Sequence, residues 1–147
     1  MINLPTDSRE FIELLNSNEV RYLVVGGYAV AYHGYPRTTG DIDFFVEVST
    51  ENAERLERVL QSFGFGSLGL TAADFLQKGV IVQLGYPPNR IDIITALNGV
   101  EFTHAWDRRV ADTIDGLPAN ILDKQSLITN KLHAGRHKDL NDVNHLR

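Results

Sequence analysis

A short apolar run that ends directly in two glycines limits this chain to a small set of folds. Residues 22–25 (Tyr-Leu-Val-Val) have the length and composition of a short buried strand, and Gly26 and Gly27 follow at once. The next residues, 28–34, are compatible with a short helix that Pro36 ends. A strand that turns at once into a helix is typical of layered proteins in which helices cover a sheet. We therefore expect a mixed α/β domain.

The apolar patterns along the rest of the chain alternate between helices and short strands. Further strands are expected over residues 41–46, 80–84, 90–95, 110–114 and 119–122, with a hairpin loop over 115–118. Longer helices are expected after the capping residues Thr6, Thr50 and Asp123. A short helix over 101–106 and a last helix beyond the break at Gly135 complete the prediction. The helix after Asp123 carries Leu127, Ile128 and Leu132, and the last helix carries Leu140, Val143 and Leu146 at three-residue spacing.

The length and composition favour one domain over residues 1–147, with 123–147 as a C-terminal helical segment. A chain of 147 residues is long enough to bury roughly 68–70% of its unfolded surface. The absence of cysteine excludes disulfides, thiolate metal sites and a cysteine nucleophile. No apolar run approaches the roughly 18 residues of a membrane helix, and the N-terminus lacks a signal-peptide pattern. The expected protein is soluble and cytoplasmic, with no membrane partner.

The charge distribution argues against binding to duplex DNA, which usually needs a basic surface. The net charge is −5, but it is uneven: residues 1–130 carry −7 and residues 131–147 carry +2. The C-terminal stretch is thus a positive island on an acidic protein. It is either a solvated helix end or a site for an anionic ligand.

Asp41 and Asp43 are the strongest local candidates for chemistry. Two residues apart on a strand, they are expected on one face, with Ile42 and Phe44 pointing toward the core. Carboxylates about 6 Å apart repel by roughly 3 kcal/mol at an effective dielectric constant of 20. Solvent, a proton, a basic neighbour or a divalent cation can offset this repulsion. Mg²⁺ suits such a pair, because it combines one or two carboxylates with phosphate oxygens.

Two further features support a phosphate and metal site. Gly26 and Gly27, which 13 intervening residues separate from Asp41, would let a phosphate approach the backbone N–H groups where a helix begins. Asp92 lies between two isoleucines in an otherwise apolar strand, where a charge is costly unless it is paired or binds metal. A salt bridge to a nearby arginine is one explanation of Asp92. The other is a cluster of three aspartates for two-metal phosphoryl transfer.

In their order along the chain, these motifs resemble the signature of the nucleotidyltransferase superfamily, whose minimal fold is that of DNA polymerase beta. The signature is a Gly-Gly or Gly-Ser turn, then Asp-x-Asp or Asp-x-Glu on the next strand, and a third Asp on a later strand. More narrowly, residues 37–43 and 131–142 resemble nucleotidyltransferase-like proteins of bacterial abortive-infection and toxin–antitoxin systems. The resemblance covers about residues 24–146. It implies a small mixed sheet with flanking helices and C-terminal helices.

The resemblance also implies an activity: Mg²⁺-dependent transfer of an NMP from an NTP to a hydroxyl. Asp41 and Asp43 would hold two Mg²⁺ ions, with Mn²⁺ as an alternative, and Asp92 would hold the ion that activates the hydroxyl or act as its base. The residues expected to contact the nucleotide phosphates are Gly26, Gly27, Arg37, Thr39, Lys131, Lys138 and, less directly, Arg136. For each of the charged residues a structural ion pair is the alternative, and Asp139 and Asp142 are expected to bridge to Lys138 or Arg136.

The acceptor stays open among RNA, protein and a small molecule, and an antitoxin-type protein or a second copy of the chain is a candidate partner. Two other function classes compete with the transferase. One is a catalytically silent module of the same fold that binds a nucleotide or a partner. The other is a different two-metal enzyme, such as a nuclease or a phosphatase, against which the Gly-Gly turn argues.

Overall fold

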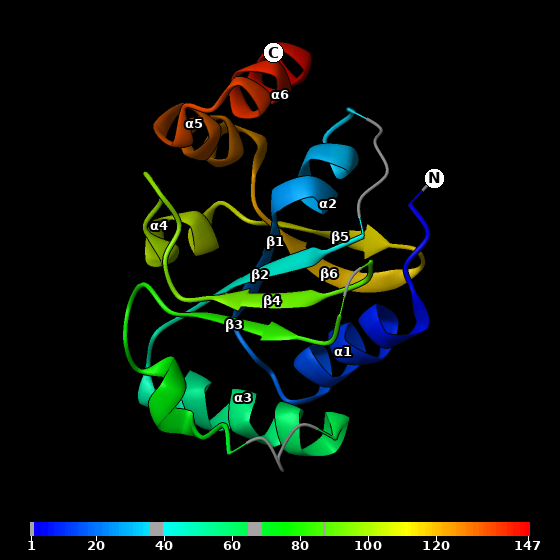
Figure 1. Cartoon of the computed structure of the whole chain (residues 1–147), viewed down its shortest axis with the longest axis vertical. Helices are drawn as coiled ribbons and strands as arrows, with labels where there is room; N and C mark the ends of the chain where they lie inside the picture. Colours follow the sequence, from blue (N-terminus) through cyan, green and yellow to red (C-terminus); the bar gives the residue numbers. More distant parts are fainter. Residues whose placement is uncertain (1, 36–39, 65–68, 87) are drawn as a thin grey trace.

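Six short strands form one mixed sheet through the centre of the molecule (Figure 1). The computed structural model describes residues 2–35, 40–64, 69–86 and 88–147. In these residues the strands are β1 (Tyr22–Val25), β2 (Ile42–Val46), β3 (Ile81–Leu84), β4 (Ile91–Ile94), β5 (Val110–Ile114) and β6 (Leu117–Ile121). Their order across the sheet is β3-β4-β2-β1-β6-β5. The pairs β1/β6 and β2/β4 are parallel, and the other neighbours are antiparallel.

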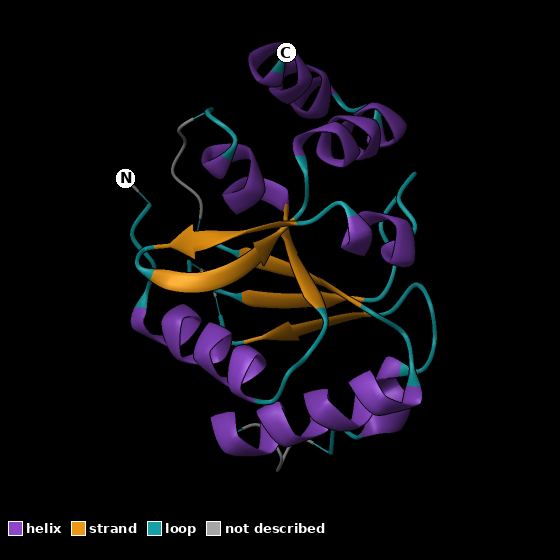
Figure 2. Ribbon diagram, turned by 180° about the vertical axis from the view of Figure 1, so that it is seen from behind, coloured by secondary structure: helices purple, strands orange, loops and turns teal. Residues whose placement is uncertain are grey.

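Helices cover both faces of this sheet, as Figures 1 and 2 show from opposite sides. Helices α1 (Thr6–Ser17) and α3 (Thr50–Phe63) lie on one face. The other face carries α2 (Gly26–Tyr32), α4 (Phe102–Asp107), α5 (Lys124–Ala134) and α6 (His137–Leu146). A short 3₁₀ turn, η2 (Ala72–Phe75), follows α3. The mixed α/β fold with C-terminal helices is therefore confirmed. Among the helices described, none has the length and apolar character needed to cross a membrane.

The core lies between the sheet and the pair α1 and α3. All four residues of β1 are buried, and so are Ile42 and Phe44 of β2, as the alternation predicts. The ring of Phe44 contacts Phe11 at 5.5 Å and Tyr22 at 5.6 Å between centroids. Each such side chain stabilises the fold by about 1.5–3 kcal/mol through burial. Because Phe44 faces this core, Asp43 is directed to the opposite face of the sheet, toward α2 and the C-terminal helices.

Two of the three predicted helix caps are wrong by one residue. Thr6 is already the first residue of α1, which starts after Pro5 without a side-chain cap. Ser49, not Thr50, caps α3, because its backbone is still extended and its side chain accepts a hydrogen bond from the Asn52 N–H. Asp123 caps α5 as expected, by accepting from the Ser126 N–H.

The predicted hairpin loop over 115–118 is also shorter than expected. Strand β6 begins at Leu117, so only Asp115 and Gly116 form the turn, with φ of +50° and +79°. Two consecutive positive φ values match the twist of an antiparallel hairpin. Of the apolar residues expected on the C-terminal helices, Leu127, Ile128, Val143 and Leu146 are buried, whereas Leu132 and Leu140 are 45% and 42% exposed. The buried faces of these helices also include Lys131, Asp139 and Asp142.

Candidate functional site

Three aspartates come together at the end of the sheet where β2 and β4 begin. These two strands are parallel, and Asp43 pairs in register with Asp92. Asp41 lies one residue before β2, outside the strand in which it was expected. It still belongs to the group, because the main-chain N–H of Arg90 donates to Asp41 Oδ1 at 3.2 Å. The predicted cluster of Asp41, Asp43 and Asp92 is thus assembled from two neighbouring strands.

Arg90, which is absent from the residues that the motifs predict, contacts two of these three carboxylates. Its Nε donates to Asp92 Oδ1 at 2.8 Å and its Nη2 donates to Asp92 Oδ2 at 3.2 Å. The same Nη2 lies 3.2 Å from Asp41 Oδ2. The salt bridge to a nearby arginine, one of the two explanations of Asp92, is therefore present. The spacing was the available signal, since side chains two residues apart in extended backbone share a face.

Asp43 is the carboxyl group whose charge is compensated least. Burial raises its pKa to about 7, and the charge of Asp92, a hydrogen bond with Asp92 and the charge of Asp41 add to the rise. Arg90 lowers the pKa of Asp43 by a smaller amount. Near neutral pH, Asp43 is therefore partly protonated. Additional positive charge at this position would release that proton.

Gly26 makes room for the Asp43 carboxyl group. Its φ is +65°, in the left-handed region that side-chain-bearing residues rarely adopt. A Cβ at this position would lie 2.1 Å from Asp43 Oδ2, which is far inside contact distance. The first glycine of the predicted turn is thus required twice, by its backbone conformation and by the approach of the aspartate.

A cavity of about 390 Å³ connects this end of the sheet with the C-terminal helices. From the sheet it is lined by Val25, Gly26 and Asp43, and from α5 and the start of α6 by Lys131, Arg136 and Asp139, among others. The cavity therefore brings together three residues that the sequence predicts for one site: Gly26, Asp43 and Lys131. Asp92 lies beside Asp43 in the register described above.

Lys131 is held by carboxylates of α6 as it lines the cavity. Its buried Nζ lies 3.3 Å from Asp139 Oδ1 and 3.1 Å from Asp142 Oδ2. Arg136 Nε donates to Asp139 Oδ2 at 2.7 Å. Burial by itself would raise the pKa of Asp139, but the hydrogen bond from Arg136 and the charge of Lys131 outweigh it and hold the pKa below its ordinary value. The structural alternative for these charged residues is thus realised, and the phosphate contact of Lys131 stays a prediction.

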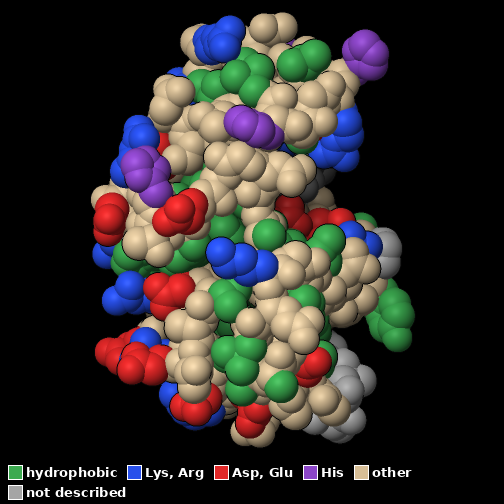
Figure 3. Space-filling view, turned by 90° about the vertical axis from the view of Figure 1, so that its left-hand side faces the viewer, with side chains coloured by type: hydrophobic (Ala, Val, Ile, Leu, Met, Phe, Trp, Pro, Cys, Tyr) green, Lys and Arg blue, Asp and Glu red, His purple; other side chains and the backbone are tan. Residues whose placement is uncertain are grey.

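The other predicted phosphate contacts are not gathered by this cavity. Lys138 is exposed on α6, and Gly27 lies in the first turn of α2; neither is among the residues that line the cavity. Arg37 and Thr39 lie outside the described residues. The positive island is also weaker than its composition indicates, because Lys131 and Arg136 are ion-paired. Acidic and basic side chains are interspersed on the face shown in Figure 3.

The donor set is chemically suited to a magnesium ion. Three carboxylates at one end of a sheet supply the oxygen ligands that Mg²⁺ takes, and a glycine rather than a larger residue adjoins Asp43. As the side chains stand, however, no group of three or more His, Asp or Glu residues in the described part of the chain is arranged to hold a metal ion. Arg90 holds two of the ligands in this arrangement. The residues therefore fit a metal if Arg90 releases Asp41 and Asp92.

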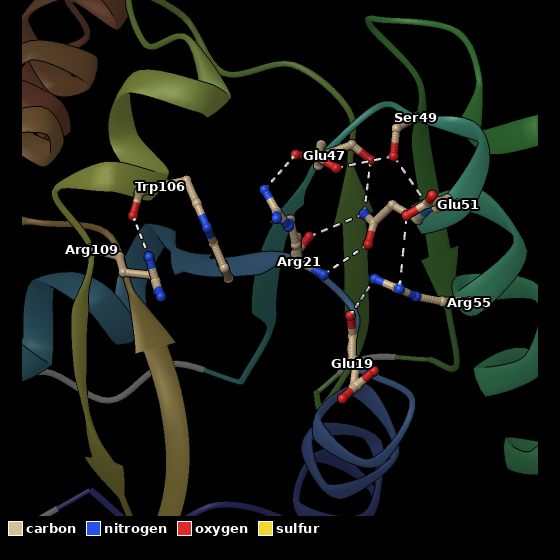
Figure 4. Close-up of polar contacts among 9 residues, drawn as sticks. Glu19, Arg21, Glu47, Ser49, Glu51, Arg55, Trp106 and Arg109 are labelled. Atoms are coloured by element: carbon tan, nitrogen blue, oxygen red, sulfur yellow. Dashed lines mark hydrogen bonds and ion pairs between the residues drawn. The ribbon is translucent and has the colours of Figure 1, made fainter.

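A second polar cluster lies at the end of the sheet away from the aspartates, where β1 begins and β2 ends (Figure 4). Its contacts hold parts of the fold together. Arg21 precedes β1 and pairs with Glu47, which follows β2, at 3.3 Å. The guanidinium groups of Arg109 and Arg21 lie 3.9 Å and 5.5 Å from the centre of the Trp106 ring. These contacts fasten α4 to the sheet. Trp106 is thus an anchor in the fold, and its cluster does not include the aspartates.

A family model described as "Nucleotidyltransferase of unknown function (DUF6036)" matches residues 6–146. A "putative nucleotidyltransferase" from Thermotoga maritima has a similar crystal structure, with 15% identity, a TM-score of 0.61, and coverage of 93% of this chain and 88% of that one. An antigenic nucleotidyltransferase-like protein from Paracoccidioides brasiliensis shares 18% identity, with a TM-score of 0.53 and coverage of 97% and 75%. At these identities the structures show a shared fold. No curated protein matches the chain.

Proposed function

The chain belongs to the family of nucleotidyltransferases of unknown function (DUF6036), and on this premise we propose that it transfers an NMP from an NTP to a hydroxyl of an acceptor. The observation that carries the proposal is that Asp43 and Asp92 lie opposite each other on neighbouring strands, beside Gly26. The family description names the same class of reaction. Carboxylates that share one end of a sheet, with Asp43 lining a cavity, suit phosphoryl transfer, because that reaction depends on positioning and charge neutralisation.

In the proposed reaction the acceptor oxygen attacks the α-phosphorus, and the bond from that phosphorus to the bridging oxygen breaks. Pyrophosphate leaves, and the hydroxyl proton passes to Asp92 as the expected base. The family resemblance assigns Asp41, Asp43 and Asp92 to two Mg²⁺ ions, which would neutralise phosphate charge and lower the pKa of the attacking hydroxyl. The chain itself positions the carboxylates through the register of β2 and β4. Gly26 has no side chain, which leaves room for the Asp43 carboxyl group beside the turn that the triphosphate would approach.

The cavity supports a further assignment for Lys131. It lines the same cavity as Gly26 and Asp43, which supports the proposal that its ammonium group contacts the β- and γ-phosphates. Its ion pairs with Asp139 and Asp142 lower the net positive charge that it can offer. We therefore assign it a supporting role in phosphate binding. Arg37 and Thr39 complete the proposed phosphate contacts.

For the acceptor we propose RNA, a protein or a small molecule, in the setting of a bacterial toxin–antitoxin system. This part rests on the resemblance of residues 37–43 and 131–142 to proteins of such systems. The interspersed charges on the face shown in Figure 3 favour an acceptor held by a few local contacts over a long duplex.

A second candidate is a silent module of the same fold that binds a nucleotide or a partner without catalysis. One specific observation favours it: Arg90 already compensates Asp41 and Asp92, so the carboxylates are stable together without a metal ion. A module that has lost catalysis could keep the cluster in this form.

Label transfer separates these candidates. The full chain is incubated with each α-³²P NTP, Mg²⁺ and either total bacterial RNA or a bacterial lysate, and Asp43→Asn is run beside it. A labelled product formed only by the wild type would support the transferase, and its chemical nature would identify the acceptor class. Equal labelling by Asp43→Asn would contradict the role of Asp43.

Calorimetry with Mg·NTP completes the test. Binding without any label transfer would favour the silent module. Release of inorganic phosphate in place of pyrophosphate would instead indicate a phosphatase and would contradict the transferase.

A further inference from the structure

Arg90 occupies the place of a counter-ion within the carboxylate site. Through its side chain it donates to both oxygens of Asp92, at 2.8 Å and 3.2 Å. It also engages both oxygens of Asp41, with the main-chain N–H on Oδ1 and Nη2 on Oδ2, each at 3.2 Å. One residue thus occupies all four oxygens of two carboxylates. A guanidinium group that donates two hydrogen bonds to one carboxylate is held in a specific orientation.

A divalent cation bound to Asp41 and Asp92 would need these same oxygens. Mg²⁺ holds its ligands at about 2.0–2.1 Å, so it competes with the guanidinium hydrogens for the lone pairs of the same oxygens. The two positive charges would also repel each other at such a short separation. Cation and Arg90 side chain are therefore alternatives in this site.

The surroundings of Arg90 allow its side chain to leave. The side chain is 25% exposed, whereas that of Asp92 is 11% exposed, so the arginine lies on the solvent side of the pair. Its departure would uncover the carboxylates without unpacking the apolar core, which lies on the other face of β2 around Phe44. The main-chain contact with Asp41 does not depend on the side chain and would keep Asp41 near the site.

We propose that Arg90 is a displaceable counter-ion that keeps the three aspartates together without a metal and that a divalent cation must expel to load the site. Arg90 thereby sets the cation concentration at which the protein becomes competent. The inference rests on the proposed function in one respect, namely that the aspartates take a divalent cation.

A fixed structural ion pair predicts a different result. If Arg90 stayed in place as a structural ion pair, Arg90→Gln would raise cation affinity only through the loss of one charge, and Arg90→Lys, which keeps the charge, would bind like the wild type. A displaceable counter-ion predicts a gain in both variants, because each removes the planar fork that competes for the oxygens of Asp41 and Asp92. A gain of cation affinity in Arg90→Lys is therefore a result that a fixed ion pair does not produce.

The experiment is a titration of the nucleotide-free full chain with Mn²⁺ alone, followed by electron paramagnetic resonance of the unbound ion. Wild type is compared with Arg90→Gln, which keeps most of the side-chain length but removes the charge. Arg21→Gln is the matched control, since Arg21 forms a comparable ion pair with Glu47 at 3.3 Å near the opposite ends of β1 and β2. The double variant Arg90→Gln with Asp92→Asn tests whether the gained affinity belongs to this site. Melting curves in chelator verify that each variant is folded.

We expect Arg90→Gln to bind Mn²⁺ about tenfold or more tightly than the wild type, since a unit charge close to the ion is removed. Arg21→Gln should match the wild type, and Asp92→Asn should abolish the gain. Unchanged or weaker binding by Arg90→Gln, with measurable binding by the wild type, would overturn the counter-ion proposal and leave the proposed function intact. If neither protein binds Mn²⁺, both fail together.

A second variant keeps the test decisive if Arg90→Gln does not fold. Arg90→Lys retains the charge but lacks the planar fork that spans Asp41 and Asp92. Its Mn²⁺ affinity should exceed that of the wild type. Affinity equal to or below the wild type would overturn the proposal.

Discussion

Asp43 and Asp92 stand directly opposite each other on two parallel neighbouring strands, β2 and β4. In this register like charges meet on one face of a sheet, an arrangement that destabilises a fold unless it is compensated. Arg90 compensates Asp92 directly, whereas a raised pKa keeps a proton on Asp43. The site therefore costs stability, as is common where strain or charge is retained for function.

The first prediction concerns stability and pH. The pKa of Asp43 rises from 3.8 to about 7 in the folded protein, so between about pH 4 and pH 7 the folded state binds more protons than the unfolded chain. Stability should therefore fall as pH rises through this window and level off above it. Allowing for solvent screening of a half-buried group, the loss is about 1–2 kcal/mol.

Asp43→Asn should remove this pH dependence. Because the asparagine carries no charge, the variant should exceed the wild type by about 1–2 kcal/mol at pH 8 and match it near pH 4.5. Urea denaturation at both pH values measures the difference. A variant less stable than the wild type at pH 8 would mean that the Asp43 carboxylate holds the fold together.

The second prediction separates backbone strain from the approach of Asp43. Gly26 and Gly135 have nearly the same φ, +65° and +68°, so alanine should cost about 1–2 kcal/mol at either position. At Gly135 the nearest atom to an added Cβ is 3.7 Å away, whereas at Gly26 the Asp43 carboxyl oxygen is 2.1 Å away. Gly26→Ala should therefore also displace Asp43 and weaken Mn²⁺ binding, and Gly135→Ala should not. Equal cation affinities in the two variants would show that the position of Asp43 is unimportant for the ion.

The third prediction concerns the buried lysine. Lys131→Met leaves Asp139 and Asp142 buried with less positive charge, which should destabilise the protein by about 3–5 kcal/mol. Lys138→Met is the control, since Lys138 is exposed on the neighbouring helix and its replacement should change stability by less than about 0.5 kcal/mol. Denaturation curves compare the two. A loss of under about 1 kcal/mol for Lys131→Met would show that the pair α5 and α6 does not depend on this ion-pair network.

The fourth prediction tests whether the polar cluster where β1 begins and β2 ends stabilises the fold without taking part in ligand binding. Buried Asn52 accepts from the Arg21 N–H at 2.7 Å and donates to the carbonyls of Arg21 and Glu47. Asn52→Ala should cost about 2–3 kcal/mol of stability, because these buried backbone groups lose their partners. Its Mn²⁺ and nucleotide affinities should not change in the folded protein. Exposed Asn144→Ala serves as the control, and a specific loss of nucleotide binding in Asn52→Ala would place this cluster in the functional site.

Several parts of the fold follow from local patterns. The burial of Ile42 and Phe44 predicts the direction of Asp43, because side chains alternate along a strand whatever surrounds it. Asp123 and Gly135 mark the ends of α5 for equally local reasons, a side-chain hydrogen bond and a left-handed backbone. Such patterns do not fix the exact residue at which an element begins. Two helix caps were predicted one residue away from their position, and the turn at Asp115 is shorter than predicted, because neighbouring polar residues can each serve as a cap or a turn residue.

The candidate site itself is predictable only in part. The chain alone places Asp43 and Asp92 on strands, and Gly26 at the end of another, because hydrophobic periodicity and turn chemistry act over a few residues. Which charged groups pair with one another depends on how close the fold brings segments that are far apart in the sequence. Arg90 meets Asp41 across 49 residues, and Lys131 turns toward α6, because electrostatic energy depends on separation and burial in three dimensions. These contacts, which no local pattern encodes, exist only once β2, β4 and the C-terminal helices are packed.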